Sequence, residues 1–339
     1  MKIGELIADK NLAEKGILQK LICGFCGISK EEMRTKSDQE IDENIFNQIQ
    51  SAYNIYIEKK KPLEYLLGYV EFFGRRFVVN EATLIPRPET EYMINSVSEF
   101  ISWKLKAESW KPKNNIPEFI SMKHESWDIK QNLLLDIWTG CGVLGLSILL
   151  QNPDFFDEAI LTDFYQDALE VAKENFRNYK WEIINDPEVS RTSKLKEVEI
   201  IQSDLLEFLI NDKWEIINEK LKKDNIWSIV LVANLPYIPE KTFDEWVGEN
   251  VKNWEPRPAF VGWEDGLDYY RKMFEQIIKN NLELGIRNEE LRNENKLVMF
   301  LEMMTWQVDI LRKEFWKKME FEEVKTFHFN IRIVKAWLK

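Results

Sequence analysis

Histidine, cysteine and glycine are scarce in this 339-residue chain, and the first two shortages argue against whole classes of site. The two histidines, His124 and His328, lie near no motif, which argues against histidine-based triads and histidine-rich metal sites. The three cysteines are an odd number, which argues against a disulfide framework. A Cys-x-x-Cys at residues 23–26 has no second pair, so we interpret it as part of a helix and expect no bound metal.

Long apolar runs and an excess of basic residues are also absent. No stretch approaches the roughly 20 apolar residues of a membrane span, and the first residues contain no signal-peptide core. The formal net charge is −12, whereas a surface that neutralises nucleic-acid phosphates needs clustered lysine and arginine. We therefore expect a cytoplasmic monomer with no membrane contact and no direct contact with nucleic acid.

Glycine is depleted while tryptophan is abundant. The chain has 13 of each, whereas glycine averages about 7% of residues in globular proteins. This imbalance is informative because some of the tryptophans fall where a glycine is expected.

Residues 1–66 are predicted to form a helical domain that docks a substrate protein, although a stabilising cap is an equal alternative. Apolar residues recur there at helical spacing, Ser29 and Glu32 fit a capping box, and Pro62 is expected to end the last helix. Residues 67–95 are predicted to be a hairpin around Gly74 followed by a Pro-rich linker, in which two prolines bar regular structure. Residues 96–339 are predicted to form the catalytic domain.

Strand and helix patterns alternate through the catalytic domain. A β–α alternation predicts an α/β fold with a doubly wound, mostly parallel sheet, and the last two strands predict a hairpin at one edge. A helix is expected to begin at Glu99, and polar segments near 100–130, 181–197 and 211–226 are interpreted as insertions. The predicted strands are residues 133–135, 159–162, 198–202, 229–232, 297–301, 324–329 and 331–337.

A glycine-rich turn follows the first of these strands. Residues 140–145 match Gly-x-Gly-x-x-Gly, and Asp163 follows at about the 20-residue distance of a carboxylate that holds a ribose hydroxyl. Asp136 precedes the turn, where it would repel a pyrophosphate but suits the cationic or amino-acid end of S-adenosylmethionine. Asp204 could accept a hydrogen bond from an adenine amino group, or it could simply cap a helix.

The turn at residues 234–237, Asn-Leu-Pro-Tyr, follows a buried strand and is predicted to be catalytic. An amide or exocyclic amine nitrogen is a poor nucleophile because its lone pair is delocalised. The Asn234 side chain and the Leu235 carbonyl could accept hydrogen bonds from its two N–H groups. Pro236 would fix the turn, and Tyr237 could stack on the planar group. An ordinary strand-end turn is the structural alternative.

Together these segments resemble the release-factor glutamine N5-methyltransferases. The most specific match is Pro-Arg-Pro-Glu-Thr-Glu at residues 86–91, and others are residues 62–68, 71–74, 136–142, 202–204, 254–257 and 260–267. The resemblance implies a Rossmann-like methyltransferase that uses S-adenosylmethionine to methylate the glutamine of the Gly-Gly-Gln motif in peptide-chain release factors, a protein methylation in translation termination. It implies that Asn234, Leu235, Pro236, Tyr237, Arg87 and Glu89 meet the substrate. It implies that the cofactor meets Asp136, Trp138, Thr139, Gly140, Cys141, Gly142, Asp163, Asp204, Leu205 and Asn234.

Two departures from the family keep alternatives open. Leu235 replaces a proline, as in methyltransferases that act on adenine N6 in RNA or DNA. Trp138, Trp263 and Trp306 stand where glycine is usual, so the chain could bind a release factor without turnover. A dehydrogenase is a distant alternative. We hypothesise that some of these tryptophans are UGA codons that the source organism reads as glycine; UGG codons at all three positions in the gene would refute this.

Overall fold

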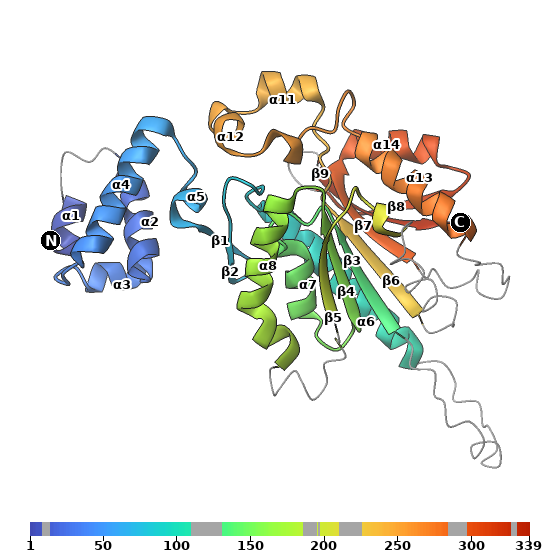
Figure 1. Ribbon diagram of the computed structural model, residues 1–339, viewed down its shortest axis with the longest axis horizontal. Coiled ribbons are helices and arrows are strands. Elements are labelled where there is room, and N and C mark those ends of the chain that lie inside the picture. Colours follow the sequence, from blue (N-terminus) through green and yellow to red (C-terminus); the bar gives the residue numbers. More distant parts are fainter. Residues whose placement is uncertain are drawn as a thin grey trace, which may run out of the picture.

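The computed structural model describes residues 1–8, 14–109, 131–185, 195, 197–209, 226–283, 297–326 and 331–339. A helical N-terminal part lies beside a larger α/β body (Figure 1). None of the helices within these ranges is long and apolar enough to cross a bilayer. Histidines 124 and 328, and most of the three predicted insertions, lie outside the described residues.

A seven-stranded sheet in the order β5-β4-β3-β6-β7-β9-β8 forms the centre of the body. The first five strands in this order run parallel, and β9 is antiparallel to both β7 and β8. This confirms the predicted doubly wound, mostly parallel sheet with an edge hairpin. The strands are β3 (Gln131–Ile137), β4 (Glu158–Asp163), β5 (Glu197–Gln202), β6 (Ile226–Ala233), β7 (Leu297–Met304), β8 (Met319–Thr326) and β9 (Ile331–Leu338).

Helices cover both faces of the sheet, and successive residues of each strand pack alternately against the helices on one face and on the other. Leu134 and Val230 pack with α6 (Glu91–Ser109), α7 (Val143–Gln151) and α8 (Gln166–Lys180). Leu133 and Leu231 pack with α13 (Asp268–Glu283) and α14 (Thr305–Glu314). Because side chains alternate along a strand, strands buried on both faces are apolar throughout, which is why these runs were recognisable.

The N-terminal helices have a hydrophobic core of their own, which includes Leu21, Ile22 and Ile49. They are α1 (Ile3–Ala8), α2 (Lys15–Cys26), α3 (Lys30–Thr35), α4 (Glu43–Lys59) and α5 (Leu63–Leu67), followed by the hairpin strands β1 (Tyr69–Phe72) and β2 (Arg75–Val78). The capping box at Ser29 is confirmed, and both cysteines of the Cys-x-x-Cys lie in α2.

Several expected element boundaries are wrong. Helix α4 ends at Lys59, just before Pro62 as expected, but Pro62 also caps the start of a further short helix, α5, because a proline is compatible with a helix start. Pro88 begins a 3₁₀ turn that continues into α6 at Glu91, eight positions before the expected start at Glu99. Residues 181–185, expected in an insertion, extend α8 as a π-helical turn because Ile183 is buried. Strand β8 begins at Met319, not at Val324.

Candidate active site

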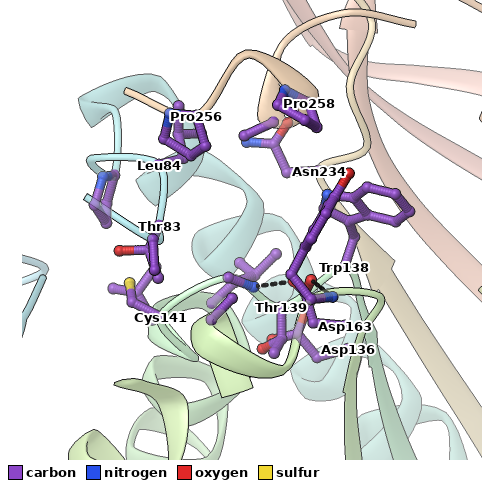
Figure 2. A pocket seen from close by; sticks show the side chains of 18 of the residues that line it. Thr83, Leu84, Asp136, Trp138, Thr139, Cys141, Asp163, Asn234, Pro256 and Pro258 are labelled. Atoms are coloured by element: carbon purple, nitrogen blue, oxygen red, sulfur yellow. Dashed lines mark hydrogen bonds between the residues drawn. The ribbon is translucent and has the colours of Figure 1, made fainter. Parts of the chain in front are cut away.

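A cavity of about 210 Å³ opens at the carboxyl ends of β3, β4 and β6. Parallel sheets bind ligands at this edge. Figure 2 shows Asp136 and Asp163 at its base, with Asn234, Pro256 and Pro258 above them. The lining residues are Ala82, Thr83, Leu84, Pro86, Thr90, Asp136, Trp138, Thr139, Gly140, Cys141, Val143, Leu144, Asp163, Tyr165, Asp167, Ala168, Asn234, Pro256, Pro258 and Ala259.

Asp136 anchors the glycine-rich turn from below. Its Oδ2 accepts hydrogen bonds from the Thr139 hydroxyl at 2.5 Å and from the Gly145 N–H at 2.8 Å. A Cβ at position 145 would lie 2.7 Å from the same oxygen, so only glycine lets the helix approach this closely. Burial raises the pKa of Asp136 to about 6, although the two hydrogen bonds oppose the rise. Oδ2 of Asp136 is therefore occupied by hydrogen bonds that hold the glycine-rich turn in place.

Asp163 joins the end of β4 to the same turn. Its carboxylate accepts hydrogen bonds from the backbone N–H groups of Gly140 and Tyr165, both at 2.9 Å. Burial raises its pKa, and these backbone donors oppose the rise. Asn175 of α8 supports the turn from the far side, because its side-chain amide donates to the Cys141 carbonyl at 2.8 Å. The turn is thus fixed at three points.

Trp138 forms an aromatic cluster beside the turn. Its ring centroid lies 4.7 Å from that of Tyr269 and 6.4 Å from that of Phe164. Asp204 and Leu205, predicted to meet the cofactor, do not line the cavity. Asp204 forms an ion pair with Lys272 on α13, and the Leu205 side chain is buried in the core. Of the predicted residues, the cavity is lined by Asp136, Trp138, Thr139, Gly140, Cys141, Asp163 and Asn234; Gly142, Leu235, Pro236 and Tyr237, like the two residues after β5, do not line it.

Two of the three suspect tryptophans have a backbone suited to glycine. The φ angle is +65° at Trp138 and +69° at Trp263, a left-handed region that disfavours side chains with a Cβ. Trp306 is the second residue of α14 and has no such strain. The geometry therefore supports the glycine hypothesis at positions 138 and 263 and gives it no support at 306.

Two glycines, Gly262 and Gly266, pack closely against the backbone of the Asn-Leu-Pro-Tyr turn. A Cβ at Gly262 would overlap the carbonyl of Pro236, and one at Gly266 would overlap the carbonyl of Tyr237. The Gln307 side chain donates to the Tyr237 carbonyl at 2.8 Å. Pro236 and Leu235 are buried, while Asn234 reaches the cavity. The backbone of the turn is therefore immobilised around one accessible amide side chain.

Glu302, on β7, lies beneath this turn and was missed in the sequence. It is 1% exposed and accepts hydrogen bonds from Thr90 and Tyr237. Burial raises the pKa of Glu302 to about 7, while the hydrogen bonds from Thr90 and Tyr237 and a direct one from the Asn234 side chain oppose the rise. Burial and the neighbouring Glu302 carboxylate also hold the pKa of Tyr237 well above its ordinary value. The available signal was a lone carboxylate within an apolar strand, since such groups are seldom buried without a role.

The linker residues Arg87 and Glu89 are close to the site but do not line the cavity. Arg87 donates to Glu255 at 2.6 Å, and the other Glu255 oxygen accepts from the Ile85 N–H at 3.0 Å. Glu255 therefore binds the linker to the segment that carries Pro256 and Pro258. The charge of Glu89 contributes to raising the pKa values of Tyr237 and Glu302, which places it near the turn.

Comparison with known proteins identifies the family, although no protein-family model matches. The release factor glutamine methyltransferase of Bacillus cereus is 31% identical over 249 residues, which cover 72% of this chain and 69% of that protein. The protein of the same name from Bacillus anthracis is 31% identical over 258 residues, covering 75% and 72%. The chain belongs to the release factor glutamine methyltransferase family.

Membership of the release factor glutamine methyltransferase family confirms the predicted resemblance and makes this chain a methyltransferase, not a dehydrogenase. Among solved structures, the N-terminal domain of human METTL16 in complex with SAH shares 12% identity, covers 97% of both chains and gives a TM-score of 0.43. That likeness is too low to carry a conclusion.

Proposed function

We propose that this protein transfers a methyl group from S-adenosylmethionine to the side-chain amide nitrogen of the glutamine in the Gly-Gly-Gln motif of peptide-chain release factors. One observation carries the proposal beyond family membership. Asn234, the residue suited to hold a planar amide, lines the same cavity as Asp136 and Asp163. A cofactor and an amide substrate would therefore meet in one place.

The residues around the cavity fit S-adenosylmethionine over most of its length. Asp163 can accept hydrogen bonds from ribose hydroxyl groups, and the turn from Thr139 to Cys141 can hold the amino-acid end. Asp204, expected at the adenine end, is instead paired with Lys272. When bound, the cofactor supplies an electrophilic methyl group on a sulfonium.

The substrate amide would be held by the turn that follows β6. The Asn234 side-chain oxygen and the Leu235 carbonyl would accept hydrogen bonds from its two N–H groups, which shifts electron density onto nitrogen. The Tyr237 hydroxyl is already committed to Glu302 at 3.1 Å, so its half-buried ring is the part left to contact a planar group. Pro236 and the two nearby glycines keep these acceptors in place, so little reorganisation is needed during reaction.

The N-terminal helices would dock the release factor. Their separate core supports a domain of residues 1–66, a linker of 67–95 and a methyltransferase domain of 96–339, although α5 and α6 cross the two proposed boundaries. We further propose that the protein works as a monomer in the cytoplasm without direct contact with nucleic acid. Light scattering of the purified protein, alone and with release factor, would test the monomer.

The decisive experiment offers radiolabelled S-adenosylmethionine to a release factor and to its Gly-Gly-Gln variant with Gln→Ala, with ribosomal RNA as a parallel substrate. We expect label only on the unchanged release factor. Label on both release factors, or on RNA alone, would overturn the proposal. Asn234→Ala should abolish the label while the exposed-surface variant Glu322→Gln retains it, since Glu322 lies on β8 away from the cavity.

A further inference from the structure

Glu302 is a carboxylate in a place where a charge is costly. It lies within the apolar strand β7, in the run Phe300-Leu301-Glu302-Met303, and these four residues are all at most 1% exposed. A buried charge without compensation would shift the pKa or destabilise the fold. Within the described ranges no cation is among the main influences on the pKa of Glu302, so hydrogen bonds must provide the compensation.

Both carboxylate oxygens of Glu302 accept hydrogen bonds from hydroxyl groups. The Tyr237 hydroxyl donates to Oε1 at 3.1 Å, and the Thr90 hydroxyl donates to Oε2 at 2.9 Å. Two donors facing two oxygens suit an ionised carboxylate, because a neutral acid would have to donate from one of them. The single proton of Thr90 is thereby committed to Glu302.

The committed Thr90 hydroxyl then determines what its neighbour can do. Its oxygen can only accept from the other side, and the Asn234 Nδ2 donates to it at 3.3 Å. An asparagine amide has a donor end and an acceptor end, so holding Nδ2 against Thr90 leaves Oδ1 available to the cavity.

We propose that Glu302 is a positioning residue that acts on Asn234, both directly and through Thr90, to set which end of the Asn234 amide faces the substrate. The proposal rests on the function given above, in which Asn234 Oδ1 accepts a hydrogen bond from the substrate amide. Thr90 belongs to the Pro-Arg-Pro-Glu-Thr-Glu segment, so this chain of bonds gives that segment a part in the reaction as well as in the cavity wall.

Protonation of Glu302 would reverse the direction of the hydrogen bonds that run between Glu302, Thr90 and Asn234. A neutral Glu302 can donate to Thr90, whose hydroxyl proton would then point at Asn234 and favour the flipped amide. The titratable groups of the described residues that face Glu302 are Glu89 from the linker, Tyr237 from the turn and Tyr270 from α13. With burial and Glu89 raising the pKa of Glu302 to about 7, the reversal falls near neutral pH.

Steady-state kinetics with a release factor test the proposal first. Glu302→Gln keeps the size but cannot ionise and replaces one acceptor oxygen by an NH2 donor, and Thr90→Val removes the hydroxyl. Each should lower kcat by about 10- to 100-fold, as a misplaced substrate does, with an unchanged cofactor Kd. Thr90→Ser should restore kcat. Wild-type kcat should fall below a pH of about 7, and this step should vanish in Glu302→Gln.

The matched control is Thr162→Val, which also removes a buried hydroxyl. Among the described residues the Thr162 hydroxyl has no hydrogen-bond partner, and it does not line the cavity. Its kcat should remain within about twofold of the wild type. If Thr90→Ser fails to rescue, or if the step near pH 7 survives in Glu302→Gln, the positioning role is overturned.

A readout independent of turnover separates this inference from the proposed function. The side-chain ¹⁵N–H resonances of Asn234, assigned by their loss in Asn234→Asp, should shift with a midpoint near pH 7 in the wild type and stay constant in Glu302→Gln. Constant resonances in both proteins would refute the proposal even if release factor is methylated. The expected titration in a protein that leaves release factor unlabelled would refute the proposed function alone.

Discussion

Trp138→Gly should tighten cofactor binding. The indole lines the cavity and packs on Phe164 and Tyr165, which follow β4, and on Tyr269 of α13, the helix that also carries the partner of Asp204. The cavity of about 210 Å³ is also smaller than the roughly 300–1,000 Å³ of typical ligand pockets. We infer that the indole fills space that the adenosine end needs and that it must move before the cofactor binds.

The size of the effect follows from the contacts that the indole must give up. Aromatic pairs contribute about 0.5–1.5 kcal/mol each, so leaving Tyr269, Phe164 and Tyr165 costs about 1.5–4.5 kcal/mol. A free energy of 1.4 kcal/mol is a factor of ten in affinity, so the cofactor Kd should fall by about 10- to 1,600-fold in Trp138→Gly. Relief of the left-handed backbone, about 1–2 kcal/mol, should offset part of the stability that is lost with these contacts.

Isothermal titration calorimetry with S-adenosylmethionine measures this directly. The control is Trp246→Ala, since Trp246 is 81% exposed on α11 (Glu240–Trp246) and does not line the cavity. Its Kd should equal that of the wild type. An unchanged or weaker Kd in Trp138→Gly, in a variant whose unfolding shows a folded protein, would refute the reasoning that the indole obstructs the site.

Three further predictions concern strain, the cofactor and pH. Trp263→Gly should raise the free energy of unfolding by about 1–2 kcal/mol in urea, because its φ is +69°, whereas Trp306→Gly should lower it by about 1 kcal/mol, because position 306 is helical. A change of the same sign in the free energy of unfolding of both variants would contradict the argument that the backbone is strained at position 263 and helical at 306. Asp163→Asn should weaken cofactor binding by about 10- to 100-fold in calorimetry, because hydrogen bonds to charged groups contribute about 1.5–3 kcal/mol, while Asp204→Asn should leave it within about twofold. An equal loss of cofactor affinity in both variants would contradict this prediction and would show that Asp204 leaves Lys272 when the cofactor binds. Glu302 has a pKa of about 7 in the folded chain against an ordinary 4.5, so the native state binds more protons between these values and its stability falls as pH rises through that window. The free-energy difference between wild type and Glu302→Gln should therefore change by up to about 3 kcal/mol between pH 5 and pH 8, and a flat difference would contradict the buried charge.

The sheet and half of the site could be predicted because their determinants are local. Apolar runs such as residues 229–232 end in polar residues, so the strands and the carboxylates at their ends are visible together. The ion pair between Asp204 and Lys272 joins residues 68 positions apart, and no local pattern reports it. Glu302 was hidden for the opposite reason, because its apolar neighbours dominate the strand pattern.

The start of α6 has a local signal in the sequence that points in two directions. Two prolines in residues 86–88 predict an absence of regular structure, yet a proline is favoured at the first position of a helix because its missing N–H is not needed there. The acidic Glu89 and Glu91 that follow suit the positive end of a helix dipole. From this segment only Pro86 and Thr90 line the cavity.

The Glu255 contact also has a consequence for how the protein is made. It joins Ile85 to a carboxylate 170 positions later in the chain. Contacts between such distant residues form late, because the entropy of closing the intervening chain must first be overcome. A nascent chain can complete its central strands β3 and β4 before residue 255 has left the ribosome. The wall that includes Pro86, Pro256 and Pro258 should therefore close last, so binding competence would mark the end of folding.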